Sequence, residues 1–261
     1  MNPEPRTDPP TRVRERPAEG LPALVHPEWS ERFPWLVQGT TAGARAPGGA
    51  FDLGLFARER PGSDVPARWE RLRTWAGADS VAHARQVHGA EVLLHGSGGP
   101  PGLWITSDCD GHATVRAGLL LAVSLADCAP VSLVDARRRA VALVHAGWRG
   151  AAAGILERGV AVLDSEAGSR ADDLHVHIGP AICGACYEVG GEVFEALGRP
   201  MPPGPTPIDL PAVLAERAAA AGVHPDRITV SEHCTRCGAV DLFSHRRGDT
   251  GRHIAFLGIR R

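Results

Sequence analysis

The sequence predicts an α/β (α+β) fold, in which one chain contains both strands and helices. Short apolar runs follow one another closely between residues 80 and 145, and turn residues bound each run. Their length and their leucine-rich or β-branched content are typical of buried strands. Elsewhere, apolar residues recur at the spacing of a helix face. Hydrophobic residues make up 43% of the chain, which is ordinary for a domain with a buried core.

The first twenty residues, 1–20, are expected to form a disordered tail that precedes a single domain at 21–261. Proline and charged residues dominate this tail, and it lacks the apolar segment of a secretory signal. From residue 21 onward, no internal repeat or linker divides the chain. One domain is therefore the simplest interpretation.

The predicted elements begin at residues 21–41, which lead into a first strand, and a glycine-rich loop follows at 43–49. A helix is predicted at 64–76, where Val65, Trp69 and Leu72 have helical spacing. Six short strands are predicted next, at 80–86, 91–95, 103–106, 119–124, 131–135 and 141–145.

After residue 145 the apolar period changes, and it predicts a helix at 148–166. The change places His145 at a junction between a strand and a helix. The remaining predicted elements are a strand at 174–178, helices at 187–197 and 210–221, and strands at 228–230 and 254–259.

Composition and charge argue against several classes of protein. A net charge of −2 gives no basic field for nucleic acid. No apolar run reaches the length of about 18 residues that spans a bilayer, so no membrane partner is expected. The chain contains no lysine, which excludes Schiff-base chemistry on lysine. Six cysteines without a signal peptide favour a cytoplasmic protein with reduced thiols.

Three residues with metal-binding side chains lie at or just past the ends of predicted strands, namely His88, Cys128 and His145. Strand ends that share one rim of a sheet would bring them together. Two imidazoles and a thiolate suit zinc, and three protein ligands leave one position open for water or substrate. The same residues could also have no role in metal binding, because most histidines are surface or core residues and a lone cysteine is usually an inert small hydrophobe.

The segments around these three residues resemble the motifs of a known protein family. They are Gln86-Val87-His88-Gly89-Ala90-Glu91-Val92, Ala126-Asp127-Cys128-Ala129-Pro130-Val131 and Val144-His145-Ala146-Gly147-Trp148-Arg149-Gly150. Further segments follow in the same order, at 178–182, 186–190, 243–247 and 250–252. Together they resemble the laccase-domain family, whose members are also called purine nucleoside phosphorylases, multicopper polyphenol oxidases or peptidoglycan editing factors. The resemblance covers roughly residues 35 to 260.

The resemblance implies a mixed central sheet flanked by helices, with one zinc ion held by His88, Cys128 and His145. It implies phosphorolysis of purine nucleosides (adenosine, inosine, guanosine and methylthioadenosine) and deamination of adenosine. The partners would be a purine nucleoside and phosphate. Copper is the alternative metal because the oxidase name also attaches to the family. The chain lacks the histidine-rich clusters that a multicopper oxidase requires, which argues against that activity.

Four further residues are predicted to act around the metal. Arg149, at a helix start near His145, is the first candidate for binding an anion. Asp127 is expected to relay a proton or to orient a ligand histidine. We expect Arg45 and Gln86 to contact substrate.

The early loop departs from the family pattern. Thr40-Thr41-Ala42 stands where the family has Thr-Arg, and Asp52-Leu53-Gly54 stands where it has Asn-Leu-Gly. Arg45 is the candidate replacement for the missing arginine.

Two other functions fit the same residues. Cys128 and His145 would serve equally as the nucleophile and base of a metal-free hydrolase that edits peptidoglycan precursors. A noncatalytic protein could instead keep zinc for stability and bind a partner.

Two Cys-x-x-Cys pairs, at 183–186 and 234–237, allow a second, structural zinc site with four thiolate ligands. The alternative is a group of four reduced thiols near the rim of the active site.

Overall fold

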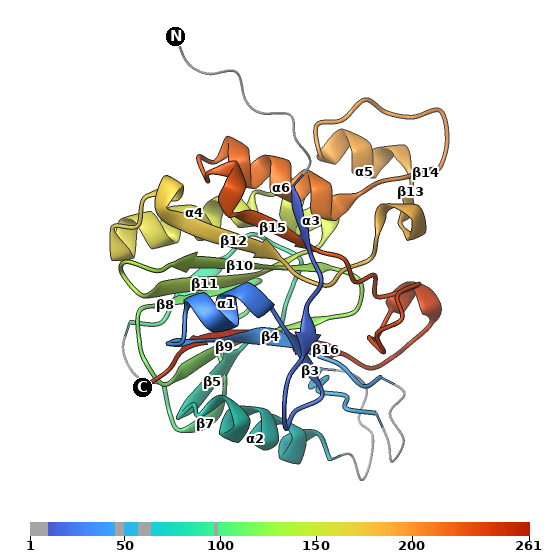
Figure 1. Cartoon of the computed structure of the whole chain (residues 1–261). Coiled ribbons are helices and arrows are strands. Elements are labelled where there is room, and N and C mark those ends of the chain that lie inside the picture. Colours follow the sequence, from blue (N-terminus) through green and yellow to red (C-terminus); the bar gives the residue numbers. More distant parts are fainter. Residues whose placement is uncertain (1–9, 45–49, 57–63, 97–98) are drawn as a thin grey trace.

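The computed structural model describes residues 10–44, 50–56, 64–96 and 99–261, and it contains two seven-stranded sheets packed face to face (Figure 1). In spatial order, the first sheet contains β1 (Thr11–Val13), β15 (Ile228–Ser231), β12 (Leu174–Ile178), β10 (Ala129–Asp135), β11 (Ala140–Ala146), β8 (Gly111–Thr114) and β6 (Val92–Leu94). The second contains β2 (Arg16–Pro17), β3 (Ala23–Val25), β4 (Leu36–Thr41), β16 (His253–Ile259), β9 (Leu119–Leu125), β5 (Ser80–His83) and β7 (Gly102–Ile105).

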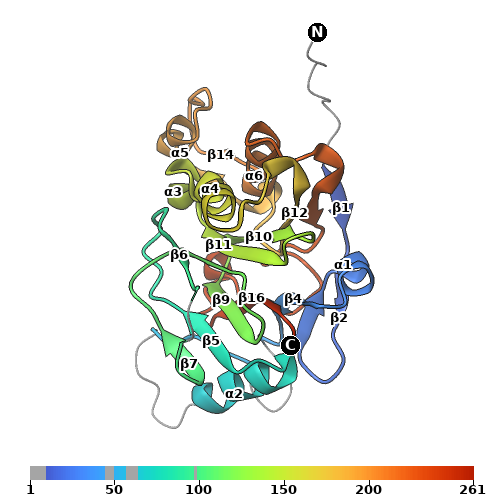
Figure 2. The same cartoon turned by 90° about the vertical axis from the view of Figure 1, so that its left-hand side faces the viewer.

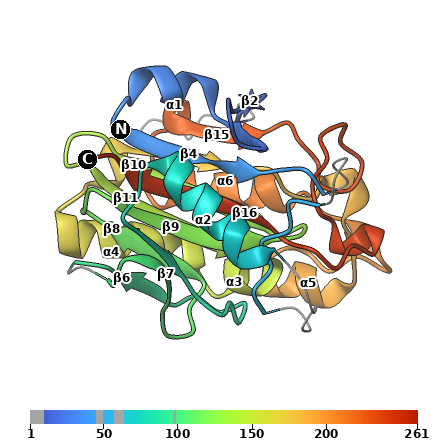
Figure 3. The same ribbon diagram turned by 90° about the horizontal axis from the view of Figure 1, so that it is seen from below.

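Helices cover the outer faces of both sheets, so the molecule has four layers (Figure 2). The helices are α1 (Pro27–Arg32), α2 (Val65–Ala76), α3 (Trp148–Ala152), α4 (Ile155–Ala167), α5 (Gly191–Ala196) and α6 (Leu210–Ala220). Helices α3, α4 and α6 lie on the first sheet, and α2 crosses the second (Figure 3). A small ribbon pairs β13 (Glu188–Val189) with β14 (Thr206–Pro207).

Three apolar clusters fill the spaces between the four layers. The middle cluster lies between the sheets and contains Val141 and Leu143 of β11. The intervening Ala142 and Val144 pack in the cluster beneath α4. Since side chains alternate along a strand, His145 follows Leu143 on the face that looks toward the second sheet. Strand β11 is thus buried on both faces and delivers His145 to the end of the space between the sheets.

The predicted α/β class and the single domain are confirmed, and all strands predicted between residues 80 and 259 are present. The strands form two sheets where one central sheet was expected. Strand β8 escaped prediction because Gly-His-Ala-Thr has no apolar alternation. Helix α1 escaped because its single turn and a half is too short for a periodic signal.

Two predicted helices need correction. The helix expected at 148–166 is two helices, because Gly154 adopts the left-handed conformation at φ 85° and ends α3. The helix expected at 187–197 is restricted to α5. A 3₁₀ turn at Gly184–Cys186 and strand β13 precede it, and the Gly190-Gly191 pair opposes helix extension toward them. In the described part of the chain, no helix combines the length and the apolar character needed to cross a membrane.

The disordered tail predicted at 1–20 is wrong for residues 11–20. Residues 1–9 lie outside the described residues. Strand β1 pairs in parallel with β15, and β2 pairs with β3. Between them, the buried carboxylate of Glu15 accepts hydrogen bonds from Nε2 of His177 at 3.0 Å and from the Ser231 hydroxyl at 2.9 Å. A proline- and charge-rich composition concealed a segment that pairs with strands far along the chain.

Replacing Glu15 with alanine should destabilise the protein by about 1–3 kcal/mol, because His177 and Ser231 would lose a buried acceptor. Burial raises the pKa of Glu15, but the hydrogen bond and charge of His177 and further hydrogen bonds lower it below its ordinary value of 4.5. The stabilisation is therefore present above pH 4.5 and is lost as the pH falls through the lowered pKa. Denaturant unfolding over a pH series measures both effects.

The matched control is Glu28→Ala, since the Glu28 carboxylate is exposed and forms an ion pair with Arg32 four residues later. It should change the free energy of unfolding by less than about 0.5 kcal/mol. Equal effects of the two substitutions would show that the segment around Glu15 does not contribute to stability.

Candidate active site

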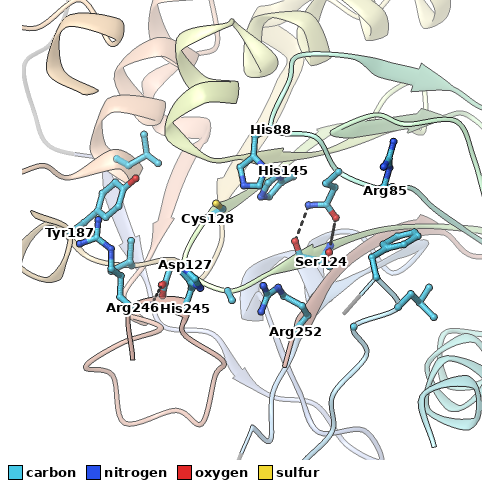
Figure 4. Close-up of a pocket in the computed structure, with 17 residues that line it drawn as sticks. Arg85, His88, Ser124, Asp127, Cys128, His145, Tyr187, His245, Arg246 and Arg252 are labelled. Atoms are coloured by element: carbon cyan, nitrogen blue, oxygen red, sulfur yellow. Dashed lines mark hydrogen bonds between the residues drawn. The ribbon is translucent and has the colours of Figure 1, made fainter. Parts of the chain in front are cut away.

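A pocket of about 560 Å³ opens at one end of the sandwich, beside strand ends from both sheets (Figure 4). Its walls come from residues 54–56, the loop after β5, the turn between β9 and β10, and the end of β11. Residues from the 182–187 and 245–252 segments, together with Leu210, complete the wall. All three predicted metal ligands line this pocket, as do Asp127 and Gln86.

His88, Cys128 and His145 converge in the pocket from three separate segments (Figure 4). Their ligand atoms all lie within 4.8 Å of one another, and the two imidazole centroids are 4.9 Å apart with an interplanar angle of 80°. Cys128 lies in the turn between β9 and β10, and His145 is the penultimate residue of β11. The arrangement can bind a metal ion through two nitrogens and one sulfur and leave a further position facing the pocket.

Asp110, which the sequence analysis missed, positions two of these ligands. Its buried carboxylate lies 2.9 Å from Nδ1 of His145, so Nε2 is left for a metal. The same carboxylate accepts the backbone N–H groups of Val87, His88 and Gly89 at 3.1, 2.9 and 2.7 Å. These bonds hold His88 at φ 61°, a conformation that non-glycine residues rarely adopt. The only signal in the sequence was an Asp-Gly pair before an unrecognised strand.

The electrostatics of the cluster favour a thiolate at Cys128 and a protonated imidazole at His145, which would release its Nε2 proton when a metal binds. Burial is the largest single effect and opposes ionisation of both Cys128 and His145, but the charges and hydrogen bonds of the neighbouring groups together outweigh it. The pKa of the Cys128 thiol is therefore lowered, and the pKa of His145 is raised with further help from Asp110. A thiolate is the form of cysteine that binds metals and attacks electrophiles.

The lack of a side chain at Gly147 provides room for two of the candidate ligands. A Cβ atom on this residue would lie 3.0 Å from Sγ of Cys128 and 3.1 Å from Cδ2 of His88. Any side chain here would have to displace two of the three ligands. The chemistry of the donor set and this cradle together fit a bound metal ion.

Asp127 and Gln86 line the pocket, but both are held by protein groups. The Asp127 carboxylate accepts the hydroxyl of Thr235 at 2.6 Å and the backbone N–H of Arg246 at 2.8 Å. No hydrogen bond from a ligand histidine to Asp127 is found among the described residues; Asp110 occupies that position. Gln86 exchanges hydrogen bonds with the backbone of Ser124 at 2.9 and 2.7 Å and so joins the loop of His88 to β9.

The two arginines predicted for anion and substrate binding have different outcomes. Arg45 lies outside the described residues. Arg149 is exposed, its guanidinium packs over the Trp148 ring at 4.2 Å, and it is not among the described residues that line the pocket. From the first turn of α3 its guanidinium packs on Trp148, which a helix start alone could not reveal.

Other side chains provide the charge and the aromatic surface of the pocket. The cations are Arg85, Arg246 and Arg252, and Arg85 is paired with Asp108. The aromatic residues are Phe56, whose side chain is exposed, and Tyr187. Tyr187, Arg246 and Arg252 lie in segments that resemble the laccase-domain family. The sequence signal that could have identified these three residues was therefore their position in the motifs at 186–190, 243–247 and 250–252.

Comparison with known proteins gives consistent matches. Residues 39–260 match the model of a family described as multi-copper polyphenol oxidoreductase laccase. The chain is 35% identical over 237 residues to purine nucleoside phosphorylase YlmD of Geobacillus stearothermophilus, covering 83% of this chain and 86% of the relative. It is 36% identical over 163 residues to adenosine deaminase RL5 from an unknown prokaryotic organism, covering 58% of this chain and 62% of the relative. The crystal structure of YlmD from G. stearothermophilus superposes with a TM-score of 0.82 at 31% identity, covering 95% of this chain and 100% of that chain.

Replacing Asp110 with asparagine should weaken metal binding by roughly 10–100-fold, because the imidazole of His145 loses its carboxylate partner. Competition with a chromogenic chelator measures the affinity. Asp135→Asn is the matched control, since Asp135 is also buried and accepts backbone N–H groups, those of Arg137 at 2.8 Å and Arg138 at 3.0 Å, away from the pocket. If both variants bind metal like the wild type, Asp110 does not position the ligands.

Replacing Gly147 with alanine should lower the metal content of the purified protein, because the new methyl group displaces Sγ of Cys128 or the ring of His88. Elemental analysis gives the metal content, and circular dichroism verifies folding. Gly96→Ala is the control, because a Cβ there meets no atom within 4 Å. Normal metal content in Gly147→Ala would argue against His88 and Cys128 as joint ligands.

Proposed function

Since the chain belongs to the multi-copper polyphenol oxidoreductase laccase family, we propose that it is a zinc-dependent purine nucleoside phosphorylase that also deaminates adenosine. The observation that carries the proposal is the cluster of His88, Cys128 and His145 at a pocket whose other walls hold arginine and aromatic side chains. Relatives named for both activities support it. When bound, zinc would act as a Lewis acid and activate water near neutral pH, the chemistry that deamination requires.

Phosphorolysis requires a phosphate held below C1′ of the ribose while the bond from C1′ to the purine breaks. Arg246 and Arg252 are the candidates for holding phosphate. Their guanidinium groups are oriented by donating to the backbone carbonyls of Glu188 at 2.9 Å and Gly251 at 2.7 Å. Both project into the pocket beneath the ligand cluster (Figure 4). Arg85 contributes less charge, because Asp108 neutralises it.

Asp127 positions this wall. Its carboxylate holds the backbone of Arg246 and the hydroxyl of Thr235, so it fixes the turn that carries His245 and Arg246. We therefore assign Asp127 a positioning role in substrate binding. His245, exposed in the pocket, is the candidate for transferring a proton to the departing purine.

The aromatic residues are suited to the nucleoside. Phe56 exposes 51% of its surface at the pocket and can stack on a purine ring. Burial raises the pKa of Tyr187 to about 12, so its hydroxyl remains protonated and can donate a hydrogen bond. The ring of Tyr187 lies 5.1 Å from the guanidinium carbon of Arg246, which joins the aromatic and cationic walls.

A cysteine hydrolase is the second candidate, because the mutual charge of Cys128 and His145 favours a thiolate beside an imidazolium. In that reaction Sγ of Cys128 attacks an amide carbonyl, the leaving amine takes a proton from His145, and water then releases the acyl group. The two candidates differ in their dependence on metal.

Replacing His145 with alanine should abolish both metal binding in the pocket and nucleoside turnover, since it removes a ligand on the rigid strand β11. Turnover is measured with and without phosphate, and the products are identified as ribose 1-phosphate for phosphorolysis or ammonia for deamination. His224→Ala, which alters an exposed histidine, is the control and should leave both unchanged.

Activity retained in metal-free protein would contradict the proposal. If iodoacetamide then abolished that activity in proportion to alkylation of Cys128, the cysteine hydrolase would be the better assignment. An oxidised phenolic product that depends on copper would instead support the oxidase name of the family.

A further inference from the structure

Four cysteines outside the pocket form a second cluster of metal-binding side chains. Cys183 and Cys186 belong to the 3₁₀ turn after β12, and Cys234 and Cys237 belong to the turn after β15. Their sulfur atoms all lie within 4.8 Å of one another, although the two pairs are about fifty residues apart in sequence. A parallel bridge between Ala181 and Cys234 brings the two turns together.

The sulfur geometry fits tetrahedral coordination. Zinc–sulfur bonds of about 2.3 Å at tetrahedral angles place neighbouring sulfurs about 3.8 Å apart. The sulfurs of Cys183 and Cys237 are 3.8 Å apart. A disulfide would require a separation of about 2.05 Å, and all four cysteines are free thiols. One pair of sulfurs thus has the tetrahedral spacing, and all four lie close enough together to surround a single ion.

Core packing does not explain the cluster. Cys237 is exposed and Cys183 and Cys186 are half-buried, so they fill no apolar interior. The backbone N–H groups of Cys183 and Cys237 point at Sγ of Cys234, at 3.3 and 3.5 Å. Such N–H groups stabilise a thiolate, and thiolates this close together repel one another unless a cation lies between them.

We propose that Cys183, Cys186, Cys234 and Cys237 bind a structural zinc ion that is separate from the metal of the pocket. Four thiolates complete the coordination of zinc and leave no position for substrate, which is the pattern of structural sites. The proposal rests on these four residues and does not depend on the proposed function.

The ion would fix one wall of the pocket. Ile182 and Tyr187 flank the first cysteine pair and line the pocket. Thr235, inside the second pair, donates to Asp127, and its backbone carbonyl accepts Nη1 of Arg247 at 2.8 Å. The four cysteines therefore join the chain segments that carry Tyr187 and the 245–247 turn.

The stoichiometry of zinc tests the proposal. Wild-type protein purified under reducing conditions should contain two zinc ions per chain by elemental analysis. Cys237→Ser and His145→Ala should each contain one, and the double variant none. Cys109→Ala is the control, because Cys109 is a buried free thiol outside both clusters and its loss should leave two ions.

Three further measurements use proteins that retain the cluster. Cobalt-substituted His145→Ala protein should show the intense absorption of tetrahedral cobalt–thiolate coordination. In wild-type protein, a thiol reagent should modify the four cysteines only after a chelator is added. Chelation of His145→Ala should also lower its melting temperature, since only the structural ion remains to be removed.

One zinc ion per wild-type chain, with the same content in Cys237→Ser, would overturn the proposal. So would thiols that react freely without a chelator, or a disulfide within the cluster under reducing conditions. Iron in place of zinc would overturn the assignment of the metal. If Cys237→Ser fails to fold, the cobalt spectrum and thiol protection decide the question.

Discussion

The carboxylate of Asp110 is the interaction on which the candidate metal centre depends. A buried charge is unfavourable unless hydrogen bonds satisfy it, and here three backbone N–H groups and the imidazole of His145 do so. These partners come from both halves of the sandwich, because the loop at 87–89 follows a strand of the second sheet whereas His145 ends a strand of the first. One side chain therefore fixes the distance between two ligands that no backbone hydrogen bond connects.

The sequence could predict the elements that depend on local pattern and those that carry a recognisable motif. Strands 119–125 and 129–135 are predominantly apolar, and His88, Cys128 and His145 lie in marked segments. The division into two sheets was not predictable in this way, since a strand buried on both faces fits one covered sheet or two stacked sheets equally well. Strand β1 was missed for a different reason, because it lies in a proline- and charge-rich segment and its partner β15 lies more than two hundred residues away.

The residues around the metal were harder to predict, because their roles depend on direction and distance. Asp127 adjoins Cys128 in sequence, yet its carboxylate turns to Thr235 and Arg246, and Asp110 takes the position beside His145. Arg149 follows a ligand segment closely, but the helical turn directs it over Trp148. For the two cysteine pairs, the sequence spacing fitted either a structural zinc site or four reduced thiols. The clustering of the four sulfurs in space favours the zinc site.

The placement of His145 on β11 has a consequence for how such a protein can diverge. This strand is buried on both faces, so the fold itself constrains the ligand and its neighbours. The contacts expected to select a substrate, such as Phe56 and Arg252, lie on segments outside the strands, where substitutions disturb little packing. Substrate preference can therefore change while the three candidate ligands are retained, and relatives of similar identity bear the names of different enzymes.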